Sequence, residues 1–242
     1  MPVPPRVQDD LLVVIYLHGF ASSNRSGKAV YLGERLRRHG VEFVAPDLNL
    51  PDFSTLTISR MLEQTRALLE AATEPVTLIG SSLGAFVAVN AAAKWPAQVK
   101  NLVLMAPALD FGPSTGSGPS RAESRDGDEG VRGPGGADIA AWKAAGDLNV
   151  FHFGYGRVLP VHYALYEDAR RYDAMDVTLS MPILIFQGRR DTAVNPATVE
   201  AWAARRPNVE LHLLDDDHQL TASLSYIWRE LEKLLNISRR AD

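Results

Sequence analysis

Residues 76–95 read VTLIGSSLGAFVAVNAAAKW, and the fold class can be inferred from this segment first. The apolar run at 76–79 is typical of a buried strand, and the Ala-rich segment at 83–94 is typical of a helix. Between them lies the pattern G-x-S-x-G, with Ser82 at its centre. This pattern between a strand and a helix indicates a tight turn that lifts a serine hydroxyl off the sheet edge. We therefore predict that Ser82 is a nucleophile; a Gly/Ser-rich turn without chemistry is the alternative.

Strand and helix patterns alternate along most of the chain. We predict strands at 11–17, 41–45, 76–79, 101–105, 182–186 and 209–213, and helices at 27–39, 57–72, 83–94, 196–204 and 221–235. The first strand is apolar on both faces, which is typical of a parallel sheet. The alternation predicts an α/β fold with a reduced, mostly parallel sheet of about six strands flanked by helices.

The alternation is interrupted between the fourth and fifth strands. We interpret residues 107–178 as a lid insertion, and residues 1–106 and 179–242 as the core. Residues 112–136 are rich in Gly, Ser, Pro and charged residues with almost no large apolar side chain, so we expect them to be flexible or disordered. Short helices are expected at 137–146 and 160–174, on either side of an aromatic-rich segment at 149–155.

Length and composition narrow the classes of protein to consider. The 242 residues fit one domain with an insertion, and the net charge of −4 argues against a nucleic-acid or anionic-membrane partner. The chain has no cysteine, which excludes disulfides and is compatible with a reducing cytoplasm. No secretory signal pattern and no membrane-spanning apolar run is present. We therefore expect a cytoplasmic protein, and the sequence leaves its oligomeric state open.

A serine nucleophile needs a base to take its proton and an acid to orient that base. Asp191 is the preferred acid, because it follows the predicted strand 182–186 and α/β sheets place their sites at the carboxyl ends of strands. The alternative for Asp191 is a plain turn residue. Asp110, just after the fourth strand, is the competing acid. The run at 215–217 lies too near the base candidate in sequence to be preferred.

His218 is the preferred base, because it lies between the last strand and the last helix and completes the chain order Ser, Asp, His. His39 ends a predicted helix and His212 lies within the last strand, so we interpret both as structural. His152 and His162 belong to the insertion, where packing or surface positions are the simpler explanation. His18 follows the first strand and is interpreted as a residue that shapes its loop.

The oxyanion of a tetrahedral intermediate needs two positioned donors. The N–H of Leu83 would lie at the start of a helix, where the positive end of the helix dipole favours an anion. The second donor is expected to be the N–H of Phe20, in the loop after the first strand, where Gly19 allows a close turn.

Four short motifs occur in order, each at the end of a predicted strand: LHGF at 17–20, GSSLG at 80–84, GRRD at 188–191 and DH at 217–218. In these motifs the sequence resembles the α/β-hydrolase superfamily, and YLHGFASS at 16–23 is similar to the small YqiA-like bacterial esterases. The resemblance implies a Ser-His-Asp hydrolase with Ser82 as nucleophile, His218 as base and Asp191 as the orienting acid. The sequence departs from many members because it leaves no room for two N-terminal antiparallel strands.

The expected function is the cleavage of carboxylic esters of small or medium acyl groups through an acyl-enzyme, with no cofactor and no metal. The partner would be a small-molecule ester, and the acyl pocket would be lined by Phe20 and four aromatic residues of the insertion: Trp142, Phe151, Phe153 and Tyr155. Alternatively, these aromatics only pack the lid onto the core. Thioester, amide or C–C bond hydrolysis, perhydrolysis, and a non-catalytic small-molecule-binding protein remain as alternative functions.

Overall fold

The computed structural model describes residues 12–111 and 139–237. Its centre is a six-stranded sheet in which every neighbouring pair of strands is parallel, in the order β2-β1-β3-β4-β7-β8. The strands are β1 (Val13–Leu17), β2 (Glu42–Val44), β3 (Val76–Ser81), β4 (Val99–Met105), β7 (Ile183–Gly188) and β8 (Val209–Leu214). The prediction of a six-stranded parallel sheet is confirmed.

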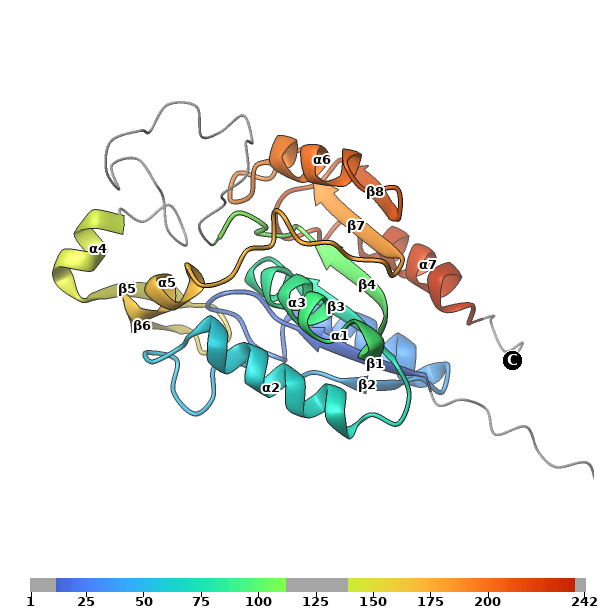
Figure 1. The fold of residues 1–242 in the computed structure, drawn as a ribbon, viewed down its shortest axis with the longest axis horizontal. Coiled ribbons are helices and arrows are strands. Elements are labelled where there is room, and N and C mark those ends of the chain that lie inside the picture. Colours follow the sequence, from blue (N-terminus) through green and yellow to red (C-terminus); the bar gives the residue numbers. More distant parts are fainter. Residues whose placement is uncertain (1–11, 112–138, 238–242) are drawn as a thin grey trace, which may run out of the picture.

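Helices cover both faces of this sheet (Figure 1). One face carries α1 (Gly27–Arg38) and α7 (Leu224–Leu235), and the other carries α2 (Ile58–Ala71), α3 (Leu83–Lys94) and α6 (Pro196–Ala204). A short 3-10 helix, η1 (Pro96–Gln98), leads into β4. Two apolar clusters fill the spaces between the layers. The strands are therefore buried on both sides, which explains their nearly continuous apolar sequences.

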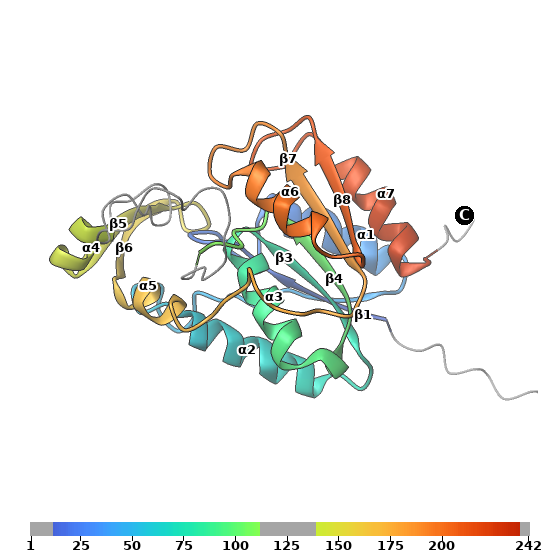
Figure 2. The same cartoon turned by 45° about the horizontal axis from the view of Figure 1, so that its top comes forward.

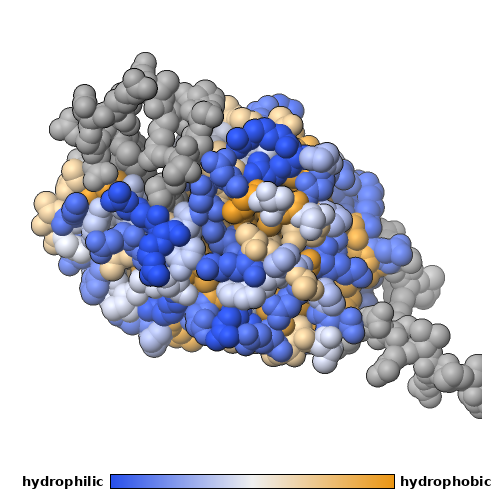
Figure 3. Space-filling model, viewed as in Figure 1, coloured by the Kyte–Doolittle hydropathy of each residue, from blue (hydrophilic) through white to orange (hydrophobic). Residues whose placement is uncertain are grey.

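The helix boundaries follow from local capping. Ser26 accepts a hydrogen bond from the N–H of Ala29 at the start of α1, and Thr57 accepts one from the N–H of Arg60 at the start of α2. Asn195 caps α6 in the same way, ahead of Pro196 at the first helical position. In Figure 3, hydrophilic residues cover most of the visible surface, with small apolar areas between them.

The chain order around the sheet creates the place for a site. After β1 the chain moves to one side to form β2 and then crosses back to form β3 on the other side of β1. In open α/β sheets, ligands bind outside the carboxyl ends of the strands at such a reversal. The register pairs Leu17 with Gly80, so the loops after β1 and β3 leave the sheet beside each other.

The segment between β4 and β7 holds α4 (Ile139–Ala145), β5 (Asp147–His152), β6 (Arg157–His162) and α5 (Ala164–Ala169). Strands β5 and β6 pair as an antiparallel hairpin that projects beside the main sheet (Figure 2). The helix predicted at 160–174 is wrong at its start, because residues 160–162 belong to β6, and α5 ends at Ala169. The segment predicted to be flexible, 112–136, lies outside the described residues.

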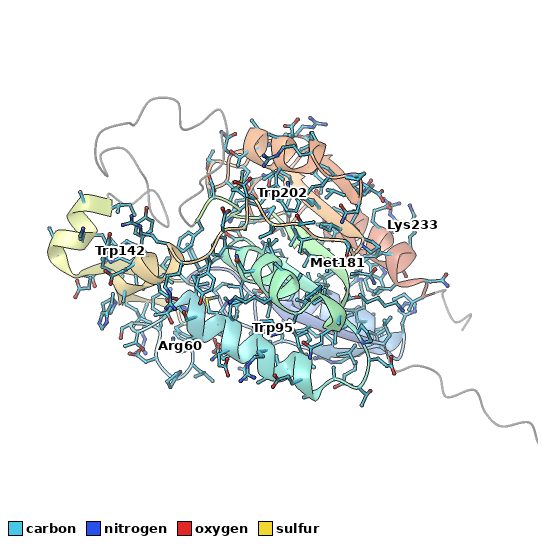
Figure 4. All side chains as sticks on the ribbon, in the orientation of Figure 1. Arg60, Trp95, Trp142, Met181, Trp202 and Lys233 are labelled. Atoms are coloured by element: carbon cyan, nitrogen blue, oxygen red, sulfur yellow. The ribbon has the colours of Figure 1, made fainter. Side chains whose placement is uncertain are left out.

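Hydrogen bonds join the segment between β4 and β7 to the core. The Phe153 N–H in the hairpin turn donates to the carbonyl of Ala21 at 2.8 Å, and the His162 N–H donates to the carbonyl of Ser54 at 2.9 Å. Asp168 of α5 accepts hydrogen bonds of 2.6 Å from the backbone N–H and the hydroxyl of Ser59, in the first turn of α2. Figure 4 shows Trp142 within the insertion and Arg60 at the start of α2 below it.

Candidate active site

The three residues predicted to form a triad lie in contact at the carboxyl edge of the sheet. His218 Nε2 lies 3.1 Å from Ser82 Oγ, and His218 Nδ1 lies 2.8 Å from Asp191 Oδ2. An ionised carboxylate only accepts hydrogen bonds, so Nδ1 carries the proton that is donated to Asp191. Nε2 is then free to accept the hydroxyl proton of Ser82. This is the arrangement that general-base activation of a serine requires.

Ser82 occupies a strained turn between β3 and α3. Its backbone has φ 53° and ψ −117°, a conformation that residues with a side chain rarely adopt. A Cβ atom at Gly80 would lie 2.5 Å from the Ala85 Cα, and one at Gly84 would lie 2.1 Å from the Leu17 carbonyl oxygen. Both glycines of the motif are therefore required by close backbone contacts, which hold the serine above the sheet.

The loop after β1 passes directly beside this turn. A Cβ atom at Gly19 would lie 3.1 Å from the Ser81 carbonyl oxygen and 3.2 Å from the Ser82 Cβ. Within residues 12–111 and 139–237, neither the Phe20 N–H nor the Leu83 N–H has a hydrogen-bond acceptor. Both donors are therefore unused within the described residues, and their role as an oxyanion hole stays a prediction.

Asp191 is buried and receives four hydrogen bonds. Its Oδ1 accepts from the N–H groups of Ala193 (2.9 Å) and Val194 (2.8 Å), and its Oδ2 accepts from His218 and from Gln187 Nε2 at 3.0 Å. Burial alone would raise the pKa of this carboxyl, but the hydrogen bonds from His218, Val194 and Gln187 outweigh it and hold the pKa below its ordinary value. Asp191 therefore stays ionised beside the imidazole.

Gln187 is a site residue that the sequence reasoning missed. It lies in β7 with no exposed surface, and its Nε2 donates both to Asp191 and to the carbonyl of Gly188 at 3.1 Å. Its Oε1 is buried without a partner. The available signal was a single polar residue at the end of the apolar run ILIF, four positions before Asp191.

The His218 loop is held from two sides. Gly188 permits close approach, because a Cβ atom there would lie 2.5 Å from the Asp217 carbonyl oxygen. Lys28 of α1 donates from Nζ to the carbonyl of Gln219 at 3.0 Å. Burial lowers the pKa of Lys28 to about 8, against the opposing attraction of Asp191, Asp217 and Asp216.

Comparisons with known proteins agree with this architecture. A family model described as "Uncharacterised protein family (UPF0227)" matches residues 13–116. No match to the sequence was found among curated proteins. Among solved structures, Est1E from Butyrivibrio proteoclasticus with ferulic acid bound matches at a TM-score of 0.76 and 18% identity, covering 97% of this chain and 92% of that one.

Two further structures match over most of both chains. A putative hydrolase from Agrobacterium vitis S4 has a TM-score of 0.75 and 25% identity, with 96% and 90% coverage. Alpha/beta hydrolase domain-containing protein 10 from mouse has a TM-score of 0.70 and 20% identity, with 93% and 89% coverage. The chain has the α/β-hydrolase fold. In this fold the turn with Ser82 follows β3, the loop with Asp191 follows β7 and the loop with His218 follows β8.

The competing acids have other positions in the α/β-hydrolase fold. Asp110 is exposed after β4, and Asp215 is exposed and forms an ion pair with Arg190. Asp216 is buried and accepts hydrogen bonds from the N–H groups of Asp217 and Ser223. Of the carboxylates weighed from the sequence, Asp191 is the one that contacts His218.

His18 is buried at the end of β1 and fixes the loop that carries Phe20. Its Nε2 accepts a hydrogen bond from the Leu48 N–H at 2.9 Å, and its Nδ1 lies 2.9 Å from the Gly19 carbonyl oxygen. Asp47 lies 3.4 Å from Nε2. Both ring nitrogens are therefore engaged with the loops after β1 and β2, in agreement with the loop-shaping role expected from the sequence.

The four aromatic residues of the insertion do not share one environment. Trp142 is buried, with its Nε1 donating to the Val161 carbonyl at 3.0 Å. Tyr155 stacks on His152 and donates to Asp47 Oδ2 at 3.0 Å. Phe151 and Phe153 are largely exposed. Trp142 and Tyr155 thus make packing contacts, and the predicted role of the four residues as a pocket lining stays a prediction.

One group of side chains in the described ranges has the spacing of metal ligands: Glu210, His212 and Glu230. Both ring nitrogens of His212 already have partners, at 2.9 Å from Glu210 and 2.8 Å from the Tyr226 hydroxyl. The group lies on β8 and α7 and includes no triad residue. Across residues 12–111 and 139–237, no helix is long and apolar enough to cross a membrane.

Proposed function

We propose that this protein is a serine hydrolase that cleaves carboxylic esters of small or medium acyl groups. The observation that carries the proposal is the continuous hydrogen-bond chain from Ser82 Oγ through His218 to Asp191. The strained turn at Ser82 and the two unused N–H donors beside it support the same chemistry. The structural neighbour Est1E binds ferulic acid, a carboxylic acid of the kind that ester hydrolysis releases, and this supports an ester substrate.

In the proposed reaction, Ser82 Oγ attacks the acyl carbon while His218 Nε2 takes the hydroxyl proton. The new C–O bond leaves a negative charge on the former carbonyl oxygen, which the Phe20 and Leu83 N–H groups bind. Collapse of this intermediate breaks the bond to the alcohol, which leaves with the proton from His218. Water, deprotonated by His218, then releases the acid and restores Ser82.

Asp191 contributes by orienting and stabilising the imidazolium that forms in each half-reaction. Its lowered pKa keeps it charged while His218 carries the extra proton. The geometry of the three residues does not depend on the leaving group. The ester assignment is therefore tested with substrates, and thioesters, amides and C–C bonds form the comparison set.

The experiment is a panel of p-nitrophenyl esters of increasing acyl length, measured with the wild-type protein and with Ser82→Ala. We expect turnover that is greatest for short or medium chains, and a loss of about 10⁶-fold in kcat in the variant. Ser81→Ala is the matched control, because it changes the adjacent serine and leaves the triad intact. Equal turnover by wild type and Ser82→Ala would contradict the proposal.

Thioesters and amides of the preferred acyl group complete the panel. A higher kcat/KM for one of these classes than for the oxyesters would reassign the reaction while keeping the triad. Tight binding of an ester without turnover, by a folded wild-type protein, would instead favour the binding-protein alternative.

A further inference from the structure

A pocket of about 480 Å³ lies between α1 and α7, away from the triad. The two helices lie beside each other on the sheet face opposite α2, α3 and α6 (Figures 1 and 2). The pocket is open to solvent, and two of the arginines in its lining, Arg38 and Arg229, are exposed. None of the residues that line the pocket takes part in the chemistry proposed above, so the pocket requires a separate explanation.

Three arginines, Arg35 and Arg38 of α1 and Arg229 of α7, line this pocket. In the described part of the chain, the arginines that form ion pairs with carboxylates are others: Arg66 of α2, and Arg171, Arg190 and Arg205, which follow α5, β7 and α6. The carboxylate of the lining, Glu232, lies 3.7 Å from His39 Nε2. Among the described residues, no carboxylate lies within ion-pair distance of these three guanidinium groups, and Glu232 is the one carboxylate of the lining.

Aromatic rings hold two parts of the pocket wall in place. The Arg35 guanidinium stacks over the Tyr31 ring at 3.5 Å and donates to the Tyr31 carbonyl at 3.3 Å. The His39 ring packs on Trp228 with 5.5 Å between ring centroids, and Trp228 is mostly buried. Because Arg35 is already positioned, binding an anion there costs less side-chain entropy than binding to a free arginine would.

We propose that this pocket binds a small molecule that carries phosphate groups. A phosphate has a charge of about −1.5 to −2 near neutral pH and three strong acceptor oxygens, which suits several guanidinium donors at once. A single carboxylate would neutralise only one of the three arginines. The chain as a whole has a net charge of −4, so this concentration of positive charge is local and not a consequence of composition.

Two kinds of ligand carry such a phosphate group: a free phosphorylated compound and a phospholipid headgroup. Isothermal titration calorimetry with inorganic pyrophosphate and with adenosine diphosphate tests the first kind. Sedimentation with phosphatidylglycerol vesicles, compared with phosphatidylcholine vesicles, tests the second. Each experiment uses the full chain, and the free-ligand titrations are repeated at higher KCl because screening must weaken such binding.

The decisive variant is Arg38→Gln/Arg229→Gln. We expect its affinity for the ligand that binds the wild type to fall at least about tenfold, as expected for the loss of charge-assisted hydrogen bonds. Arg66→Gln/Arg205→Gln is the matched control, because it removes the same charge from α2 and from the residue that follows α6, both outside the pocket. Circular dichroism and thermal melting establish that both variants fold.

The results of these experiments distinguish a free phosphorylated ligand from a lipid headgroup and from the absence of a phosphate site. Binding of pyrophosphate or adenosine diphosphate that weakens in the pocket variant alone supports a free phosphorylated ligand. Binding only to phosphatidylglycerol vesicles, with the same arginine dependence, assigns a lipid headgroup. No binding of any probe, or equal affinities in the two double variants, overturns the proposal. Ser82→Ala is expected to bind as the wild type does, so the result is independent of the hydrolase assignment.

Discussion

Gln187 and Asp191 are joined by a hydrogen bond of 3.0 Å from the side-chain amide in β7 to the carboxylate in the loop that follows. The accepting oxygen is the one that His218 also contacts. The amide therefore fixes the orientation of the group that orients the proposed base. A side chain of the buried strand β7 thus positions the carboxylate at the carboxyl edge of the sheet.

Replacing Gln187 with leucine should separate activity from stability. The amide oxygen is buried without a partner, so its removal relieves a cost of about 1–3 kcal/mol, which offsets the loss of the two hydrogen bonds that Nε2 donates. We expect Gln187→Leu to unfold at an equal or higher denaturant concentration while kcat falls about 10-fold or more. Urea unfolding and ester hydrolysis measure the two effects.

A variant of Gln187 that loses stability and keeps full kcat would show that the amide serves only packing. The pH profile of kcat/KM gives an independent check, because a positioning role predicts a changed profile for the base. Asn195→Ala, which removes the cap of α6 further along the same loop, is the control for general disturbance of the segment.

The assignment of the acid is tested by Asp191→Asn against Asp110→Asn. We expect kcat to fall about 10⁴-fold in Asp191→Asn, because an amide in place of the carboxylate favours the wrong imidazole tautomer. Asp110→Asn should keep its activity, since Asp110 is exposed after β4. Loss of activity in the second variant, with a harmless change in the first, would mean that the acid has been misassigned.

Gly84→Ala should disrupt the turn at Ser82. The added Cβ would lie 2.1 Å from the Leu17 carbonyl oxygen and 2.6 Å from that of His18, and neither backbone atom can rotate away. We expect a loss of about 3 kcal/mol or more in the free energy of unfolding, measured by urea titration. Gly27→Ala is the control, because no atom lies within 4 Å of a Cβ there. Equal stability of the two variants would contradict the packing described for the motif.

The lowered pKa of Lys28 predicts that the free energy of unfolding depends on pH. Its pKa is about 8 in the folded protein against 10.5 in the unfolded chain, so between these values the unfolded chain binds more protons. This group therefore makes the free energy of unfolding rise with pH across that window. Lys28→Met lacks this rise.

We therefore compare the free energy of unfolding of Lys28→Met with that of the wild type. The value for the variant minus that for the wild type should be greatest below pH 8 and fall by about 1–3 kcal/mol towards pH 10.5. Urea unfolding at a series of pH values measures the difference. Lys100→Met, at an exposed position in β4, is the control. A difference that stays constant over the window would show that Lys28 does not titrate as described.

The elements with strong local signals were predictable, and those fixed by tertiary contacts were not. Helices α3 and α6 have the predicted bounds because the apolar composition of α3 and the Asn195–Pro196 start of α6 are local features. The hairpin of β5 and β6 was missed because Pro160, paired with Asn149, argues against a strand in sequence. Its position depends on contacts with Ala21 and Ser54, more than 100 residues away in the chain.

The same distinction applies to the site. Ser82, Asp191 and His218 follow strands in a recognisable order, so their proximity could be predicted from topology. The role of Gln187 depends on which way a buried side chain points, and strand periodicity does not determine that. The hydrogen bond from Lys28 to Gln219 joins residues 191 positions apart, so no local sequence pattern could predict it.

The most direct measurement of the central claim is reaction with a fluorophosphonate, followed by intact-mass analysis and peptide mapping. We expect a single adduct on Ser82, absent in Ser82→Ala, retained in Ser81→Ala and greatly slowed in His218→Ala. A wild-type protein that is folded by circular dichroism and forms no adduct, or forms one on another residue, would contradict the claim that Ser82 is an activated nucleophile.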